Sequence, residues 1–335
     1  QEADRLLVFN PASVARDALV EADSAGWRNP VTGEPVPSVR LASERFQLLV
    51  KSLPACGSVL LDRCAGTAPQ PASLPASDAN AHTLESPWFR LTLDPRKGAI
   101  RQILDKRNGQ VLLPKGKPFG TYVYDVFDND DITRYLRAAA RRYSDWWIHD
   151  FGRIGYPEAL RHYTESPRDF TLADVRRDAF ATSVEMRRTR TADESRGVRD
   201  YGDVHTVVLT IELSNLEPVI DLSLRIAGDQ MTPLIESGSI RFPLALGNAR
   251  WRINTLGCVE DPMRDIVGNA NHAVYAVEDW VDLEDDRAGM TFLTRDAHLL
   301  SRGENAIYTF RSAPVRRAPE PWFNLFWTKH PKWMV

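Results

Sequence analysis

The sequence predicts an all-β chain, with a small β-sandwich at its start and a much larger β-sandwich after it. Two observations predict this class. Apolar and polar residues alternate in short segments along most of the 335 residues, and turn-forming residues separate these segments at regular spacing. One stretch, residues 131–177, departs from this alternation and predicts a helical insertion.

The first domain is predicted to cover residues 1–66. Four segments within it have the composition of short strands: 5–9, 16–22, 37–41 and 45–51. Residues 67–81 are rich in Ala, Pro and Ser and contain few large apolar side chains, which predicts a linker. The second domain is then predicted to cover residues 82–335.

The second domain opens with two clear hairpin signals. Phe89, Leu91 and Leu93 alternate with polar residues, and a Pro- and Gly-containing turn at 94–98 leads to a second strand at 99–104. An Asn-Gly turn follows at 108–109. Further strands are predicted at 205–213, 220–226, 240–246, 251–259, 273–283, 289–294 and 306–312.

Within the insertion, the apolar residues at 132, 136, 139, 143 and 146–147 follow helical spacing. Asp130 or Asp131 is predicted to cap this first helix. Pro157 predicts the start of a short second helix over 157–163, and residues 169–177 are expected to form a third.

Composition and motifs exclude several classes of function. Lys and Arg (42) nearly balance Asp and Glu (45), so we expect no nucleic-acid or membrane partner. No segment approaches the ~20 apolar residues that span a bilayer. The chain also lacks a Gly-rich phosphate loop and a His or Cys spacing typical of zinc sites, and its seven His are scattered.

The three cysteines are too few for a disulfide framework. Cys56 and Cys64 would pair only if they lay on adjacent strands. Free thiols in a reducing compartment, such as the cytoplasm, are the favoured interpretation.

Three groups of residues carry candidate chemistry. The acidic cluster at 125–131 fits helix capping, with calcium binding as the alternative. Aromatic residues gather at 143–151 and 322–327 among polar side chains, a mixture that suits either sugar stacking or core packing. The carboxylate pairs Asp145/Asp150, Asp128/Asp131 and Glu278/Asp279 exist, but no pair is singled out for glycoside hydrolysis.

Short motifs along nearly the whole chain resemble α-mannosidases of glycoside hydrolase family 38. Residues 6–11, which end in Asn10-Pro11, resemble the opening of the first β domain after the family's catalytic barrel, and residues 53–57 resemble its end. Residues 88–94, 98–100 and 104–109 are similar to the opening of the family's C-terminal β-supersandwich. Its later strands resemble 240–244, 261–262, 277–283 and 289–300, and residues 324–331 resemble a degenerate Asn-x-Trp-x-Thr-Asn segment.

The resemblance implies a galactose-mutarotase-like supersandwich over residues 82–335. It also implies that the chain is the C-terminal, non-catalytic portion of a glycoside hydrolase. A strand that starts within the first six residues likewise predicts a fragment or a processed product. The family's catalytic Asp and zinc ligands lie in an N-terminal α/β barrel, so the resemblance implies zinc for that barrel and no cofactor in this chain. No family catalytic or metal residue carries over, and residues 127–130 stand where the family's Trp-Asp-Ala-Trp segment is usual.

The expected partners are a carbohydrate and the catalytic barrel. The residues expected at the rim of a carbohydrate site are Tyr122, Tyr124, Asp128, Asn129, Trp147, His149 and Arg153. The alternatives are a free-standing carbohydrate-binding module, a purely architectural piece, or a mutarotase-like enzyme. The enzyme would need His205 or His272 to meet Glu212 or Glu278 in one cleft.

Overall fold

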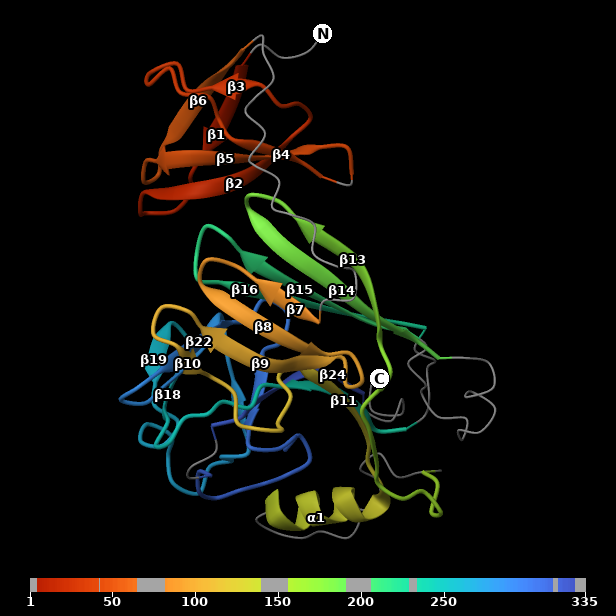
Figure 1. Cartoon of the computed structure of the whole chain (residues 1–335). Coiled ribbons are helices and arrows are strands. Elements are labelled where there is room, and N and C mark those ends of the chain that lie inside the picture. Colours follow the sequence, from red (N-terminus) through yellow and green to blue (C-terminus); the bar gives the residue numbers. More distant parts are fainter. Residues whose placement is uncertain are drawn as a thin grey trace. The chain divides into compact units, whose positions relative to one another are not determined.

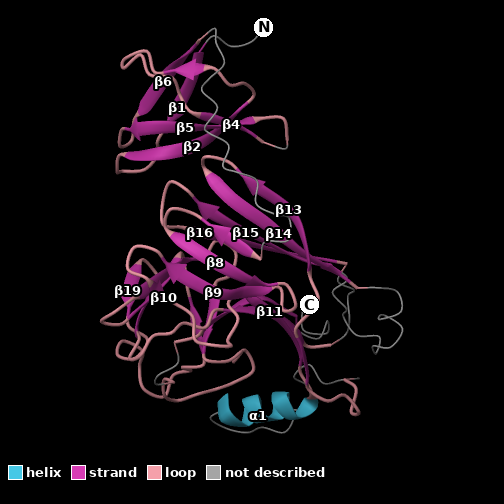
Figure 2. Ribbon diagram, in the orientation of Figure 1, coloured by secondary structure: helices cyan, strands magenta, loops and turns pink. Residues whose placement is uncertain are grey.

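The computed structural model confirms an all-β chain. It describes residues 5–41, 43–64, 82–139, 156–190, 206–228, 234–315 and 319–328. Within these ranges every element except helix α1 (Asn129–Ala139) is a strand (Figure 2). The chain divides into two compact units: residues 1–79 together with the segments 176–182 and 214–217, and the remaining residues. No helix in the described ranges is long and apolar enough to cross a bilayer.

The smaller unit is a sandwich of two three-stranded antiparallel sheets (Figure 1). One sheet has the order β1 (Arg5–Phe9), β6 (Ser58–Arg63), β3 (Trp27–Arg28); the other has the order β2 (Arg16–Ala22), β5 (Phe46–Leu53), β4 (Ser38–Arg40). Val8 and Leu61 from the first sheet meet Leu48, Val50 and Leu53 from the second in one apolar core. The predicted linker, 67–81, lies outside the described residues.

Asn10 shows why an Asn-Pro pair follows β1. Its side chain is fully buried, and its Nδ2 donates to the carbonyl oxygens of Val14 and Pro54, each at 2.9 Å. Its Oδ1 accepts from the amide of Ala12 at 3.1 Å. The amide side chain thereby ties the end of β1 to the segment after β5, so that buried carbonyl groups keep hydrogen-bond partners.

The larger unit contains four antiparallel sheets. The first has the order β10 (Gln110–Val111), β9 (Ala99–Asp105), β8 (Phe89–Asp94), β7 (Thr83–Glu85). The second, with six strands, has the order β12 (Tyr163–Glu165), β11 (Thr121–Val126), β17 (Glu236–Arg241), β24 (Pro321–Thr328), β23 (Leu299–Arg302), β20 (Val274–Ala276). The third has the order β13 (Thr171–Arg177), β14 (Ala181–Thr189), β15 (Thr206–Ser214), β16 (Ile220–Ala227). The fourth has the order β19 (Cys258–Glu260), β18 (Arg250–Thr255), β21 (Trp280–Glu284), β22 (Gly289–Leu293).

One continuous apolar core joins these four sheets. Leu91 of β8, Tyr122 of β11, Leu209 of β15, Trp251 of β18 and Leu300 of β23 all belong to it. Because each sheet turns one set of alternating side chains toward this core, the layers form the predicted supersandwich. The hairpins β8–β9 and β15–β16 form in the predicted places.

The prediction of a wholly helical insertion is wrong in its second half. Helix α1 confirms its start, and residues 140–155 lie outside the described part. Residues 157–163 contain a turn rather than a helix, and residues 171–177 form β13, which joins the sheet beside β14. Pairing with β14 across the short turn at 178–180 satisfies the backbone of this segment, and this hairpin outweighs its local helix preference.

Two other expectations also differ from the structure. Residues 306–312 form no strand, and the strand predicted at 240–246 lies earlier, at Glu236–Arg241. All three cysteines are free thiols.

Candidate functional site

The candidate site lies on one face of the six-stranded sheet. All six residues of β11 are buried. Tyr122, Tyr124 and Val126 belong to the hydrophobic core. Side chains alternate across a strand, so Asp125 points to the opposite face, where the register places it beside Ser237 of β17. We call the side that carries Asp125 and Ser237 the polar face of the sheet.

Helix α1 begins next to Asp125 with a reciprocal capping arrangement. Asp128 Oδ1 accepts hydrogen bonds from the amides of Asp130 and Asp131, each at 2.9 Å. Asp131 Oδ2 accepts from the amide of Asp128 at 3.1 Å. The carboxylates thereby satisfy amides that a helix start leaves unpaired. The cap is Asp128, not Asp130 or Asp131 as predicted, although capping does account for this part of the acidic cluster.

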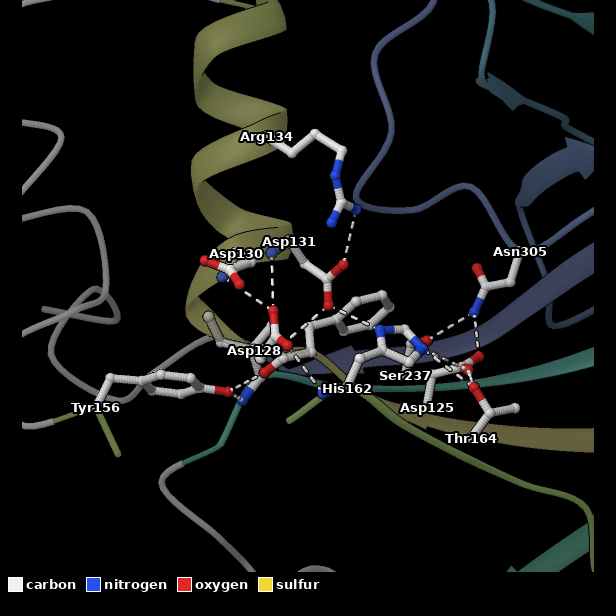
Figure 3. A network of polar contacts seen from close by, with 12 residues as sticks. Asp125, Asp128, Asp130, Asp131, Arg134, Tyr156, His162, Thr164, Ser237 and Asn305 are labelled. Carbon is white, nitrogen blue, oxygen red and sulfur yellow. Dashed lines mark hydrogen bonds and ion pairs between the residues drawn. The ribbon is translucent and has the colours of Figure 1, made fainter. Parts of the chain in front are cut away.

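His162 connects the helix start to the sheet (Figure 3). Its amide donates to Asp128 Oδ2 at 2.9 Å, and its Nδ1 lies 2.7 Å from Asp131 Oδ2. On the other side of the ring, Nε2 lies 3.1 Å from Thr164 Oγ1 and 3.6 Å from Asp125 Oδ1. The imidazole therefore stands between two buried carboxylates.

The Asp125 carboxylate is fully engaged. Its Oδ1 accepts from Thr164 Oγ1 at 2.6 Å, and its Oδ2 accepts from Asn305 Nδ2 at 2.7 Å. Asn305 Nδ2 also donates to Ser237 Oγ at 3.0 Å. Asn305 comes from the segment between β23 and β24, so this segment lies over the polar face near Asp125 (Figure 3).

Two aromatic residues close the network on its apolar side. The Phe127 and His162 rings meet edge to face, with 5.5 Å between their centres. The hydroxyl of Tyr156 donates to the carbonyl of Phe127 and accepts from the amide of Ile235 at 3.2 Å. Burial raises the pKa of Tyr156 to about 12, so it remains a neutral donor.

The charges in this network favour a protonated His162 at neutral pH. The nearby carboxylates of Asp125 and Asp131 raise the pKa of His162 to about 10, although burial opposes this change. Burial acts to raise the pKa of Asp131, but the hydrogen bonds from His162 and from the Asp128 amide outweigh it and lower that pKa. A histidine that stays protonated at neutral pH is a poor general base. The network is therefore suited to holding the helix, sheet and loop in place.

The structure describes four of the seven predicted rim residues, and their role at a carbohydrate site stays a prediction. Tyr122 and Tyr124 lie in the core, Asp128 caps α1, and Asn129 is the first residue of that helix. Trp147, His149 and Arg153 lie outside the described residues, so their role stays a prediction. Sequence reasoning missed His162, Thr164 and Asn305, because only the tertiary fold brings them to Asp125.

The other predicted chemistry is distributed as follows. His272 is buried, whereas Glu278 is exposed and accepts from the amide of Gly257 at 2.9 Å. His205 and the aromatic segment 143–151 lie outside the described ranges. Within those ranges no three His, Cys, Asp or Glu side chains are arranged to hold a metal ion, and the carboxylates around His162 already have partners.

Comparison with solved structures identifies the fold. The α-mannosidase from Enterococcus faecalis V583 is 11% identical and matches 98% of this chain and 43% of its own, with a TM-score of 0.55. A protein in glycosyl hydrolase family 38 from Enterococcus faecalis is also 11% identical and matches 96% of this chain and 43% of its own, with a TM-score of 0.56. The fold is therefore that of a β-rich part of family 38 α-mannosidases, which confirms the resemblance at the level of the fold. The chain spans less than half the length of these proteins.

A galactose mutarotase-like protein from Lactobacillus casei ATCC 334 is 12% identical and matches 72% of this chain and 86% of its own, with a TM-score of 0.40. The fold assignment therefore rests on the two Enterococcus faecalis structures. A family model described as a domain of unknown function (DUF5054) matches residues 56–221. No curated protein matches the sequence.

Proposed function

We propose that this chain is the non-catalytic portion of a larger glycoside hydrolase resembling α-mannosidases. In that protein it supports a catalytic barrel and contributes to the rim of a carbohydrate site. The observation that carries the proposal is the fold match over 98% of this chain and only 43% of the α-mannosidase chain.

The chemistry of the described residues supports a non-catalytic role. The carboxylates Asp125, Asp128 and Asp131 are all occupied by hydrogen bonds or ion pairs. A glycosidase needs one carboxyl group that donates a proton and another that attacks or activates water. Neither role fits carboxylates that already hold a protonated histidine and a helix start. In this proposal the zinc and the catalytic carboxylate belong to the barrel.

Assays of the purified chain test the proposal. With an aryl α-mannoside as substrate and zinc added, we expect no turnover above a zinc-only blank. Hydrolysis that scales with the concentration of this chain would overturn the proposal. The coding sequence upstream of residue 1 gives an independent test, because the proposal requires an α/β barrel in the same reading frame.

A free-standing carbohydrate-binding module is the second candidate. This candidate predicts saccharide binding by a protein whose reading frame contains no barrel. The upstream sequence therefore separates the two candidates.

A further inference from the structure

We propose that the outward face of strands β1 and β6 is a docking surface for the catalytic barrel of the longer polypeptide. Leu7 and Phe9 of β1 and Leu60 of β6 form this surface, and we call it the β1–β6 face. The choice of partner rests on the proposed function, whereas the surface itself follows from the side chains of the small sandwich.

Alternation along the two strands divides their side chains between the core and this face. Val8 and Leu61 belong to the core of the sandwich. Leu7, next to Val8 in the sequence, therefore points the other way, and the register places Leu60 directly opposite it. Phe9 lies on the same face, one row or roughly 7 Å further along β1. Three large apolar side chains thus lie on two neighbouring rows.

The described residues leave these three side chains open to solvent. Leu7 is 63% exposed, Phe9 is 59% exposed and Leu60 is 38% exposed. Single apolar residues on a surface are common, whereas a contiguous group of them marks an interaction site. β1 also lies at the edge of its sheet. Natural proteins cover or charge such edges, because an open apolar edge associates with other chains.

The outward face of another sheet shows how this chain treats a surface that meets water. The central rows of β18 and β21 place Arg252 opposite Asp282 and Arg250 opposite Glu284, with ion pairs of 2.7 Å and 3.4 Å. Charged rows of this kind are typical of a sheet face in contact with solvent. The apolar rows of the β1–β6 face therefore indicate a protein neighbour.

Polar residues lie at both ends of the apolar rows. Arg5 and Asp62 form the row before Leu7 and are joined by an ion pair of 3.4 Å. Ser58 lies opposite Phe9 at the other end. An apolar centre with a polar rim is the usual anatomy of a protein–protein contact. The expected partner surface is therefore apolar at its centre, as it is between packed domains of one polypeptide.

The length of the matched structures favours a domain of the same polypeptide as the occupant. The match covers 98% of this chain and 43% of the α-mannosidase chain, so more than half of that protein lies outside the matched part. In the proposed longer protein the barrel precedes β1, which begins at Arg5. A domain attached before β1 is held near the β1–β6 face at a high effective concentration. A second copy of this chain, the other candidate occupant, has no such advantage.

Thermal unfolding of two variants, each made in the isolated chain and in the longer protein, tests the proposal. The first variant combines Leu7→Thr with Phe9→Thr, which keeps strand-forming residues on β1. The second, Val31→Thr, is the control, because Val31 is a 90% exposed apolar residue of the same sandwich outside the β1–β6 face. In the isolated chain we expect both variants to shift the melting temperature by less than about 2 °C, since exposed side chains contribute little.

In the longer protein the two variants should differ. The combined variant should lower the melting temperature by about 4–8 °C, because two apolar side chains lose their burial against the barrel. Val31→Thr should again have little effect. If the combined variant has equal effects in the two proteins, the docking proposal is overturned and the proposed function stands. A reading frame without a barrel would overturn both.

Sedimentation of the isolated chain tests the other occupant. We expect the unaltered chain to be a monomer, because the barrel is the proposed partner of the β1–β6 face. A dimer that becomes a monomer when Leu7→Thr and Phe9→Thr are introduced would assign this face to a second copy of the chain. That result would overturn the barrel as its partner.

Discussion

The ionic network at His162 makes stability depend on alkaline pH in a defined direction. Asp125 and Asp131 raise the pKa of His162 from 6.5 to about 10. A group whose pKa is higher in the folded state stabilises the fold fully below its unfolded pKa. That contribution is lost as the pH rises through the folded value. His162 should therefore stabilise the larger unit below about pH 6.5 and lose this effect as the pH approaches about 10.

The size of the effect follows from the pKa change and from solvent exposure. The full change would correspond to about 5 kcal/mol if water did not reach the ring. The His162 side chain is 42% exposed, so solvent screening reduces the expected contribution to about 1–2 kcal/mol. For a unit of this size that corresponds to a change in melting temperature of about 2–8 °C.

Thermal unfolding of the unaltered chain and of His162→Gln between pH 6 and pH 10.5 measures this contribution. The difference in melting temperature should be largest at pH 6 and should shrink steadily toward pH 10.5. His82→Gln, at an exposed position, is the control and should follow the unaltered chain at every pH. A difference that stays constant or grows with pH would refute the argument, because it would mean that His162 acts without its charge.

Two further predictions concern local geometry. Gly98 has φ +54°, and a Cβ there would lie 2.3 Å from the Phe170 ring, so Gly98→Ala should destabilise the chain by about 2–4 kcal/mol in urea unfolding. Gly109 is the control: it has φ +74° and a Cβ there would meet nothing within 4 Å, so Gly109→Ala should cost only about 1–2 kcal/mol. If the two substitutions lowered the free energy of unfolding equally, the Phe170 ring would be shown to move aside without cost. Asp128→Ala removes the cap of α1 and should lower the free energy of unfolding by about 1–2 kcal/mol in the same measurement. Asp128→Asn keeps a capping oxygen and should lower it less. Equal destabilisation by the two substitutions would argue against the capping role.

Local pattern predicts much of the fold. The alternation at Leu91 and Leu93 and the Asn-Gly turn at 108–109 place β8 and β9 correctly, because short hairpins are determined by residues close in sequence. The same holds for β15 and β16. Residues 171–177 were predicted wrongly, although they form a hairpin with β14, because the turn signal at Asp178 was missed: Asp178 Oδ1 accepts from the amides of Phe180 and Ala181.

The candidate sites could be predicted only in part. The acidic cluster and the aromatic segment at 322–327 are visible in the sequence, but their meaning depends on register. β11 pairs with β17 across more than a hundred residues, and only this pairing brings Asp125 to Ser237. Likewise, Ser239 meets Asn324 only after a bulge at Leu325 of β24 sets the register with β17. Neither long-range register is encoded in a local pattern.

The central proposal, that this chain supports a separate catalytic barrel, is tested most directly in the longer protein that the proposal requires. The rate of aryl α-mannoside hydrolysis should be measured for the longer protein intact and for the same protein without these 335 residues. The account predicts hydrolysis by the intact protein and loss of both activity and thermal stability after the deletion. A truncated barrel that keeps its full rate and melting temperature would contradict it.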